Sequence, residues 1–531
     1  MPADNRRMLI IGIDSGDRNL IKRWVESGDL PTFRHLLDTS AWGDTNNSTG
    51  MVAGTVWPSF YTGVLPGRTG RFRGTTQFVS GTYSHADIDF GRCSSPSFWD
   101  RLSDAGIKSV VVDAPYAFLS EKPNVSQVVD WCSHSAWKDG TTVSKPANWA
   151  EEVRGEYGRD PLGKCDFVTL DTVADFTRFR DGLIERINTK RQFTERVLEQ
   201  GTSLLLNVFS ECHCAGHQLW HLHDETHPLY DPAMVAALGG DPLLQIYQAM
   251  DAAVAGLLEA ADEKMSVMVF CSHGIGPAYT GTHLLDEVLM KIEGRASPRK
   301  RQSIAQTMVS IWTKLPRDLR TVLTPLQKLL WPRLKSGLVQ PGKANRRFFE
   351  IIVNDATGGV RLNLKGREPN GVVEAEEYDG ICETVTRELL ALINPETGQP
   401  LIKRVMKSRD IYPGPRVDQL PDLLVVWDRT GPISESVSES TGRISQKFVF
   451  SNHRSGDHTE DDGLVFATGP GIEPGYIGDI PIADLAATLL EAFGVEATDL
   501  DGNAVAALIG TSVHDHEAVE SDEDNRSVAG S

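Results

Sequence analysis

Short apolar runs alternate with helical patterns along most of this chain, and this alternation restricts the fold more than any other feature. Runs typical of strands buried on both faces occur at residues 8–13, 203–209, 266–271 and 421–426. Amphipathic helices are predicted at residues 20–25, 33–37, 181–198, 243–261, 378–392 and 482–493. Helices that alternate with buried strands predict an α/β fold with a largely parallel sheet covered on both faces.

Three further segments complete this outline. Residues 98–118 predict a helix, a turn and a strand that ends at a proline. Residues 348–364 return to strand-like patterning, with Gly358 and Gly359 expected in a turn. Residues 51–70 are rich in glycine, proline and hydroxyl side chains, and we expect a loop whose backbone amides face a ligand.

Polar residues follow several predicted strands, at the edge where open α/β sheets place their chemistry. Asp14 follows the strand at 8–13, His273 follows the strand at 266–271, and His458 lies in a polar turn at 451–462. Because the ends of parallel strands share one edge, residues hundreds of positions apart can meet there. Asp14 taken alone would equally suit a helix N-cap or a turn.

The stretch at 209–224, FSECHCAGHQLWHLHD, holds the densest set of metal-binding side chains in the chain. Four imidazoles, two thiols and two carboxylates fall within about four turns of a helix. His213 and His221 cannot bind one ion, because eight helical residues span roughly 12 Å and each zinc–nitrogen bond is about 2 Å. The stretch predicts a metal site that includes His213 and His217. A polar surface turn rich in histidine is the alternative reading.

Residues 51–73 bring a hydroxyl group close in sequence to several guanidinium groups. Thr55 precedes Trp57, and Arg68 is followed by two more arginines. A hydroxyl near guanidinium groups suits attack on a phosphoryl group, or binding of one. The alternative is a plain loop with a solvated basic edge.

Charge and cysteine content exclude several classes of protein. The net charge of −19 argues against general nucleic-acid binding, which needs a basic surface. The seven cysteines form no CxxC pair, so neither a zinc ribbon nor a disulfide framework is indicated. No apolar run reaches the roughly 18 residues of a membrane span, and the apolar run near the N-terminus is too short for a signal peptide. We therefore expect a cytoplasmic protein.

Two segments differ from the rest of the chain. Residues 295–347 hold thirteen Lys and Arg against one acid, Asp318, with apolar residues at helical spacing. This basic segment could cap a cleft for an anionic substrate, contact a membrane or partner, or pack on the core as a helical insert. Residues 511–531 are acidic and predict a disordered tail. The expected organisation is a core at 1–294 and 348–510, an insert at 295–347 and a tail at 511–531.

An ordered set of short motifs runs along the chain: IGIDSG at 11–16, WPSFYTG at 57–63 with PGR at 66–68, SE at 210–211 with His217, SHG at 272–274, GVRLN at 359–363 with GREP at 366–369, LPDL at 420–423, and GDH at 456–458 with GPG at 469–471. With these motifs the chain resembles the type I phosphodiesterase and nucleotide pyrophosphatase branch of the alkaline phosphatase superfamily. The resemblance runs from about residue 8 to 510 and omits the basic insert.

The resemblance implies an alkaline-phosphatase-like α/β/α sandwich with a mostly parallel central sheet. It also implies a two-metal site, usually zinc, that cleaves phosphate esters or diesters through a Thr or Ser nucleophile. Carried over by position, the first ion would be held by His213, His217 and His458, and the second by Asp14, Ser272 and His273. His453 is the alternative to His458 as the late ligand.

Three positions depart from the family pattern. His213 stands where the family has an aspartate, which makes the first site an all-imidazole triad that still suits zinc. Ser272 replaces another aspartate and is a poor ligand, so the number of bound ions, one or two, stays open. The nucleophile register falls on Ala53, and Thr55 lies two residues later. Either Thr55 attacks the substrate or a metal-activated water does.

These observations predict a metal-dependent hydrolase of phosphate esters or diesters that takes a small anionic substrate. The candidate metal ligands are Asp14, His213, His217, His273 and His458, the candidate nucleophile is Thr55, and the candidate substrate contact is Arg68. Two other readings stay open. One is a single-zinc enzyme of the same fold that acts on another bond or transfers a group, and the other is a non-catalytic binding protein.

Overall fold

The computed structural model describes residues 6–47, 49–74, 76–87, 95–133, 141–162, 168, 170–296, 343–354, 356–450 and 454–510. The chain divides into two compact units. The first unit is formed by Met1–Thr69, Asp89–Tyr279 and Val449–Ser531, and the second by Gly70–Ile88 and Thr280–Phe448. The candidate site residues named above all belong to the first unit.

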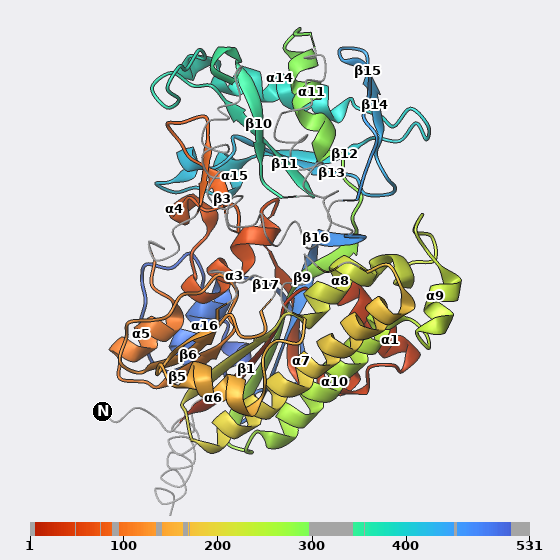
Figure 1. Ribbon diagram of the computed structural model, residues 1–531. Coiled ribbons are helices and arrows are strands. Elements are labelled where there is room, and N and C mark those ends of the chain that lie inside the picture. Colours follow the sequence, from red (N-terminus) through yellow and green to blue (C-terminus); the bar gives the residue numbers. More distant parts are fainter. Residues whose placement is uncertain are drawn as a thin grey trace, which may run out of the picture. The chain divides into compact units, whose positions relative to one another are not determined.

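Within the described residues, the first unit is built on a nine-stranded sheet (Figure 1). β1 lies between β8 and β9 and is parallel to both, with Ile13 level with Phe209 and Cys271. The antiparallel pairs are β16 with β2 and β9, and β6 with β7. The strand order is β17 (Gly475–Pro481), β2 (Ala41–Asn46), β16 (Gly456–Thr468), β9 (Met265–Pro277), β1 (Arg7–Ile13), β8 (Leu204–Phe209), β5 (Ser109–Val112), β6 (Val125–Val129) and β7 (Val143–Lys145).

Helices cover both faces of this sheet. One buried core contains Leu9 and Ile11 of β1 together with α1 (Arg18–Ser27), α2 (Pro31–Thr39), α7 (Val173–Glu199), α8 (Glu211–His223) and α10 (Pro242–Ala260). The opposite core contains Met8 and Ile10 together with α3 (Val52–Thr62), α5 (Phe98–Asp104) and α16 (Asp484–Ala492). Successive residues of β1 face opposite cores because side chains alternate along a strand. The predicted α/β/α sandwich with a mostly parallel sheet is confirmed.

The other α-helices described in this unit are α4 (Pro66–Thr69), α6 (Trp149–Glu156) and α9 (Pro232–Ala237). The helix predicted at 181–198 is the C-terminal part of the longer α7, which begins with a capping box at Thr172 and Asp175. The strand predicted at 203–209 is confirmed as β8, and the histidine-rich stretch after it is the helix α8.

The second unit contains a smaller, antiparallel sheet. Its strand order is β10 (Phe348–Ile352), β11 (Thr357–Leu362), β13 (Leu423–Trp427) and β12 (Ile402–Lys407). Helices α11 (Thr282–Ile292) and α14 (Tyr378–Leu390) share its buried core. The remaining elements are the hairpins β3 (Thr76–Phe78) with β4 (His85–Asp87) and β14 (Glu435–Ser438) with β15 (Gly442–Ser445), and the short α15 (Ser408–Ile411).

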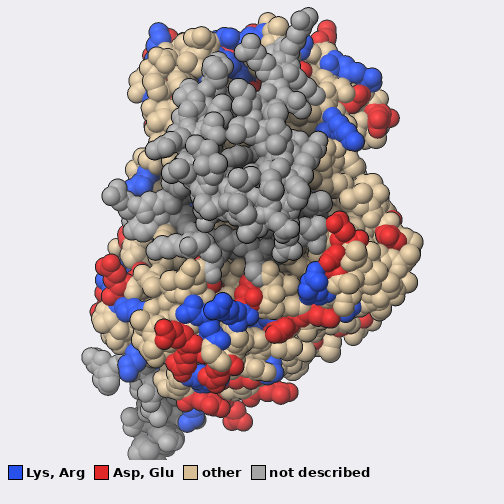
Figure 2. Space-filling view, in the orientation of Figure 1, with Lys and Arg blue, Asp and Glu red and all other residues tan. Residues whose placement is uncertain are grey.

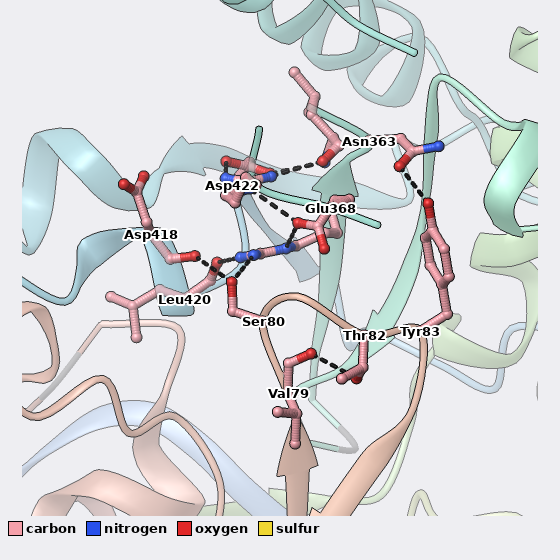
Figure 3. A network of polar contacts seen from close by, with 12 residues as sticks. Val79, Ser80, Thr82, Tyr83, Asn363, Glu368, Asp418, Leu420 and Asp422 are labelled. Carbon is pink, nitrogen blue, oxygen red and sulfur yellow. Dashed lines mark hydrogen bonds and ion pairs between the residues drawn. The ribbon is translucent and has the colours of Figure 1, made fainter. Parts of the chain in front are cut away.

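Buried charges join the β3–β4 hairpin to this antiparallel sheet (Figure 3). Arg361 of β11 donates to the Glu368 carboxylate at 2.7 Å and to the Ser80 hydroxyl, in the hairpin loop, at 2.8 Å. Arg367 donates to both oxygens of Asp422, at 2.8 and 2.6 Å. Arg361 and Glu368 have fully buried side chains. The motifs at 359–363, 366–369 and 420–423 therefore hold the second unit together.

The turn expected at Gly358 and Gly359 is wrong, because both residues lie inside β11. A Cβ atom on Gly358 would lie 2.4 Å from Leu285, and one on Gly359 would lie 2.8 Å from the Ile351 carbonyl. These glycines therefore permit close packing on both sides of the strand. The reason for glycine at these positions is visible only from the residues that pack against them in the folded structure.

The loop expected at residues 51–70 is also wrong, because the segment forms α3 and α4 despite Pro58 inside α3. Proline removes one helical hydrogen bond and normally disfavours a helix interior. Here Val56, Trp57, Phe60 and Tyr61 are buried in the core on that face of the sheet. Their burial outweighs the local cost of the proline.

Two strands extend further than the apolar patterns predict. β9 continues through His273 to Pro277, and β16 begins at Gly456, so neither His273 nor His458 lies in a turn. The added residues pair with each other, with His458 opposite Ile275 and a register shift between His458 and Asp462. A polar strand end can persist because a neighbouring strand satisfies its backbone hydrogen bonds.

Most of the predicted insert at 295–347 and the predicted tail at 511–531 lie outside the described residues. Among the helices of the described ranges, none has the length and apolar character that crossing a membrane requires.

Candidate metal centre

Two histidines stand one helical turn apart on α8, which begins directly after β8. His213 is 5% exposed and His217 is fully buried. Residues four apart share one face of a helix, and the two Nε2 atoms lie 3.0 Å from each other. The structure therefore brings together the two histidines that the sequence singles out in this stretch.

A third imidazole reaches this pair from β16. His458 Nε2 lies 3.4 Å from His213 Nε2, and the His458 ring centroid is 4.8 Å from those of both His213 and His217. β16 approaches α8 at Gly456, where a Cβ atom would lie 2.1 Å from the Gly216 carbonyl. The absence of a side chain at Gly456 therefore allows His458 to reach the α8 histidines. His453, the alternative late ligand, lies outside the described residues.

Hydrogen bonds at the Nδ1 atoms determine what the Nε2 atoms can do. His217 Nδ1 donates to the Gly456 carbonyl at 2.7 Å, and His213 Nδ1 faces Asp14 Oδ2 at 2.8 Å. A carbonyl and a carboxylate only accept, so the proton of each neutral ring is on Nδ1 and Nε2 carries a lone pair. Two lone pairs that face each other at 3.0 Å repel, and a cation bound between them removes this repulsion.

The spacing of these nitrogens fits a metal ion. Ligand atoms of a tetrahedral zinc with bonds of about 2.0 Å lie about 3.3 Å apart. The observed Nε2 separations of 3.0 and 3.4 Å lie close to this value. Acceptors on the opposite ring nitrogens, here Asp14 and the Gly456 carbonyl, are the usual way in which proteins orient metal-binding imidazoles. These residues therefore fit a zinc-type ion.

Asp14 directly follows β1, and His273 lies within the neighbouring strand β9. Asp14 Oδ1 accepts hydrogen bonds from Trp57 Nε1 at 2.7 Å and from Ser272 Oγ at 3.1 Å. Burial acts to raise the pKa of Asp14, but the charges of His213 and His273 and the hydrogen bonds from His213 and Trp57 outweigh it. The pKa of this carboxyl is held well below its usual range. Burial lowers the pKa of His273, and the Asp14 charge offsets only part of this effect.

Two overlapping groups of described residues could hold an ion. His213, His273 and His458 each offer one ligand atom, and these atoms lie within 4.8 Å of one another. The same holds for His217, Asp457 and His458. Imidazole and carboxylate ligands suit zinc and other first-row divalent metals. Asp457, the carboxylate of the GDH motif at 456–458, is a candidate ligand that sequence reasoning missed.

Thr55 lies in the first part of α3 and is 2% exposed. Its hydroxyl donates to the Met51 carbonyl at 2.6 Å, the bond that a helical threonine often makes to the residue four positions earlier. Its neighbour Trp57 reaches the metal centre through Asp14, a contact that sequence reasoning missed. The nucleophilic role of Thr55 stays a prediction.

Arg68 lies in α4, where its Nη1 atom is 3.1 Å from the Asp501 carboxylate. The guanidinium is thus engaged in a partly exposed ion pair, and its role in substrate binding stays a prediction. His221 bonds to Ser455 Oγ through Nδ1 at 2.8 Å, and burial lowers its pKa to about 4. This agrees with the expectation that His221 does not join His213 on one ion.

The chain is similar to a known protein family in sequence profile and to several solved structures. The profile of the type I phosphodiesterase / nucleotide pyrophosphatase family matches residues 8–441. A comparison with curated proteins found no match. Similar solved structures include human ectonucleotide pyrophosphatase/phosphodiesterase 5, with 11% identity and a TM-score of 0.47 over 96% of this chain and 100% of that one. Phosphonoacetate hydrolase from Sinorhizobium meliloti 1021 has 13% identity and a TM-score of 0.48 over 91% and 95% of the two chains.

The profile match takes in most of the 531 residues, including the segments that carry Asp14, the α8 histidines and His273. The chain belongs to the type I phosphodiesterase / nucleotide pyrophosphatase family and is a metal-dependent hydrolase of phosphate esters or diesters.

Proposed function

We propose that His213, His217 and His458 hold the ion with which this chain hydrolyses its phosphate ester or diester. The observation that carries this proposal is the 3.0 Å approach of two imidazole Nε2 atoms whose Nδ1 atoms are both committed to acceptors. A stable arrangement of that kind calls for a cation. We propose zinc, because three imidazoles with a fourth position open are a known catalytic zinc set.

An ion at this centre supplies Lewis acidity, which neutralises charge on phosphoryl oxygens and lowers the pKa of water. The chain's own residues orient the imidazoles that would hold it. Asp14 keeps the Nδ1 proton of His213 directed away from the centre, and the Gly456 carbonyl does the same for His217. Burial of these side chains limits the access of water and strengthens each electrostatic contact.

The roles of the other candidate residues remain proposals at this site. For Asp14 and His273, the family resemblance implies a role as ligands of a second ion. Thr55 is the proposed nucleophile and Arg68 the proposed contact for substrate oxygens. Residues 295–347, which lie largely outside the described ranges, are a proposed contact for an anionic substrate or a partner.

Metal analysis combined with hydrolysis of aryl phosphate mono- and diesters tests the proposal. We expect a chelator to abolish hydrolysis and zinc to restore it, and we expect His217→Ala to lower kcat/KM at least about 100-fold. His35→Ala, an exposed histidine on α2, is the matched control and should leave activity unchanged. Activity that survives both the chelator and His217→Ala would contradict the proposal.

Thr55→Ala and Thr55→Ser test the proposed nucleophile. To attack, the Thr55 hydroxyl must leave the Met51 carbonyl. We expect Thr55→Ala to lose hydrolysis and Thr55→Ser to keep it, because serine retains the hydroxyl. Full activity in Thr55→Ala would instead assign the attack to water.

We also propose that the protein acts in the cytoplasm. None of the five cysteines in the described ranges forms a disulfide, which suits a reducing compartment. Fractionation of cells that express the full chain would test this, and recovery outside the cytoplasm would contradict it.

A further inference from the structure

Four residues beside the three-histidine group are joined by hydrogen bonds in a cluster that we call the serine ring: Asp14, Ser15, Ser272 and His273. Ser272 Oγ donates to Asp14 Oδ1 at 3.1 Å and faces His273 Nδ1 at 2.8 Å. The Ser15 backbone N–H donates to Ser272 Oγ at 3.0 Å, and Ser15 Oγ faces His273 Nε2 at 3.0 Å. The ring ties the residues that follow β1 to the middle of β9.

The positions of the protons in the serine ring follow from its contacts. Ser272 has one hydroxyl proton, and the Asp14 carboxylate can only accept it. Ser272 Oγ therefore accepts from His273 Nδ1, so the Nε2 atom of neutral His273 has the lone pair. That lone pair accepts the hydroxyl proton of Ser15. Every polar atom of the ring side chains thus has a partner within the protein.

Ser15 is held in a backbone conformation that serine rarely adopts. Its φ is 54°, in the left-handed region that favours glycine. The conformation is stabilised from both sides, since Tyr247 donates to the Ser15 carbonyl at 3.0 Å and Ser272 accepts from the Ser15 N–H. Strain that surrounding contacts maintain is typical of functional positions. Here it directs the Ser15 hydroxyl, which is fully buried, at His273.

Ligand chemistry separates this ring from the three-histidine group. A catalytic zinc takes three protein ligands from cysteine, histidine and carboxylate side chains. The serine ring offers only two of that kind, Asp14 and His273, because its other members are neutral hydroxyl groups. The Asp14 carboxylate already accepts from Trp57, Ser272 and His213. The residues present therefore do not fit a second zinc ion.

We propose that the serine ring takes the place of a second metal ion, so that the chain binds one ion, at His213, His217 and His458. In this arrangement Asp14 and His273 are positioning residues. Asp14 orients the ligand His213, and His273 is held by the two serines. The inference rests on the proposed function, because it counts the ions at the same centre.

The test is the number of zinc ions that the full-length chain binds after chelation and dialysis, measured by elemental analysis and calorimetric titration. We expect one ion per chain in the wild type, one in His273→Ala and none tightly bound in His217→Ala. His273→Ala is decisive because His273 also lies within ligand distance of His213 and His458. Loss of the ion in that variant would overturn the proposal.

Position 272 offers a matched pair of variants. Ser272→Asp adds the missing carboxylate next to Asp14 and His273, and we expect two ions per chain with a melting temperature that zinc raises more than in the wild type. Ser272→Asn has nearly the same size without the charge, and we expect one ion. A single ion in Ser272→Asp would overturn the role given to this serine.

The outcomes also separate the inference from the proposed function. Two ions in the wild type would overturn the serine ring as a replacement and leave a metal-dependent hydrolase. No ion in the wild type would overturn both. The number of zinc ions bound by the wild-type protein tests the proposal even if a variant fails to fold.

Discussion

At the scale of single residues, the candidate metal centre depends on the groups that orient the imidazoles as much as on the imidazoles themselves. Asp14 fixes His213, and the Gly456 carbonyl fixes His217, each through Nδ1. Trp57 then fixes Asp14 with an indole N–H at 2.7 Å. We therefore expect Trp57, which is not a candidate ligand, to affect the rate of hydrolysis through Asp14 and His213.

Trp57→Phe should lower kcat/KM by about tenfold, because a hydrogen bond to a buried charge is worth about 1.5 kcal/mol or more. The variant keeps an aromatic ring in the core. Trp99→Phe makes the same change at a buried tryptophan on α5 and should leave kcat/KM unchanged. Steady-state kinetics and thermal melts of both variants provide the measurement, and equal activities would contradict the role of Trp57.

Glu350 of β10 makes the stability of the second unit depend on pH. Burial raises its pKa to about 7, with Asp286 adding to the effect and Lys343 partly offsetting it. The folded state therefore keeps a proton that the unfolded chain releases near the ordinary value of 4.5. The stabilisation is complete below that value and is lost as pH rises to about 7.

Glu350→Gln removes this loss. The free energy of unfolding of the variant, relative to that of the wild type, should therefore rise by about 2 kcal/mol when the pH is raised from 5 to 8. Denaturant unfolding at the two pH values measures the difference. Glu383→Gln, an exposed position on α14, is the control and should show no such trend. A difference that is constant with pH would contradict the assignment.

At the scale of elements, α8 places its histidines by packing closely against β9 and β16. A Cβ atom on Gly216 would lie 2.4 Å from Ile275 of β9, and Gly456 of β16 approaches the Gly216 carbonyl in the same way. The two glycines thus set the distance between the helix and the strand that carries His458. Side-chain size at these positions determines whether the three imidazoles meet.

Gly216→Ala should destabilise the protein by about 1–3 kcal/mol and weaken zinc binding, although alanine favours a helix by about 1 kcal/mol. The second change Ile275→Ala should recover part of both losses, because it removes the side chain that the new methyl group meets. Gly380→Ala in α14 is the control, since a Cβ there would meet no atom within 4 Å. It should stabilise slightly. Unfolding curves and zinc titrations measure these effects, and unchanged zinc affinity in Gly216→Ala would contradict the packing argument.

The Arg361 network sets the stability of the antiparallel sheet in the second unit. Arg361→Met should cost about 3 kcal/mol, because removing one partner leaves the buried Glu368 with less compensation. Arg387→Met removes a pair whose arginine side chain is 68% exposed, and it should change stability by less than about 0.5 kcal/mol. Denaturant unfolding of both variants measures the difference, and equal effects would show that burial of the pair is unimportant.

At the scale of the whole molecule, the distribution of charge bears on how an anionic substrate could bind. On the face shown in Figure 2, acidic and basic side chains of the described residues lie interspersed. The net charge of −19 also opposes binding to a polyanion. A small anionic substrate therefore depends on local groups, such as the ion at the centre.

The candidate metal centre joins parts of the first unit that are distant in sequence, since Thr280–Phe448 of the second unit lie between α8 and β16 along the chain. Binding to the folded state alone raises stability, so zinc should raise the melting temperature of the chelator-stripped protein by about 5 °C or more. His217→Ala should show no such rise. Calorimetry of both proteins with and without zinc tests this, and equal shifts would place the ion elsewhere.

Much of the first unit follows from local sequence. The continuous apolar runs predict β1, β8 and the first half of β9, because strands buried on both faces need apolar side chains throughout. The density of histidine in α8 predicts a metal site containing His213 and His217. Short-range patterns carry this information because burial and helical spacing act over a few residues.

Other features were decided only by tertiary structure. α3 forms in spite of Pro58 because its apolar face is buried, and β9 continues past Cys271 because β16 pairs with it. Three further features are not predicted by the neighbouring sequence. They are the hydrogen bond from the Thr55 hydroxyl to the Met51 carbonyl, the bond from Trp57 to Asp14 and the backbone conformation of Ser15. Sequence alone thus determined the fold class and the main candidate for a metal-binding stretch. Which donors face one another depends on close approaches between distant segments, and only the packed structure specifies those.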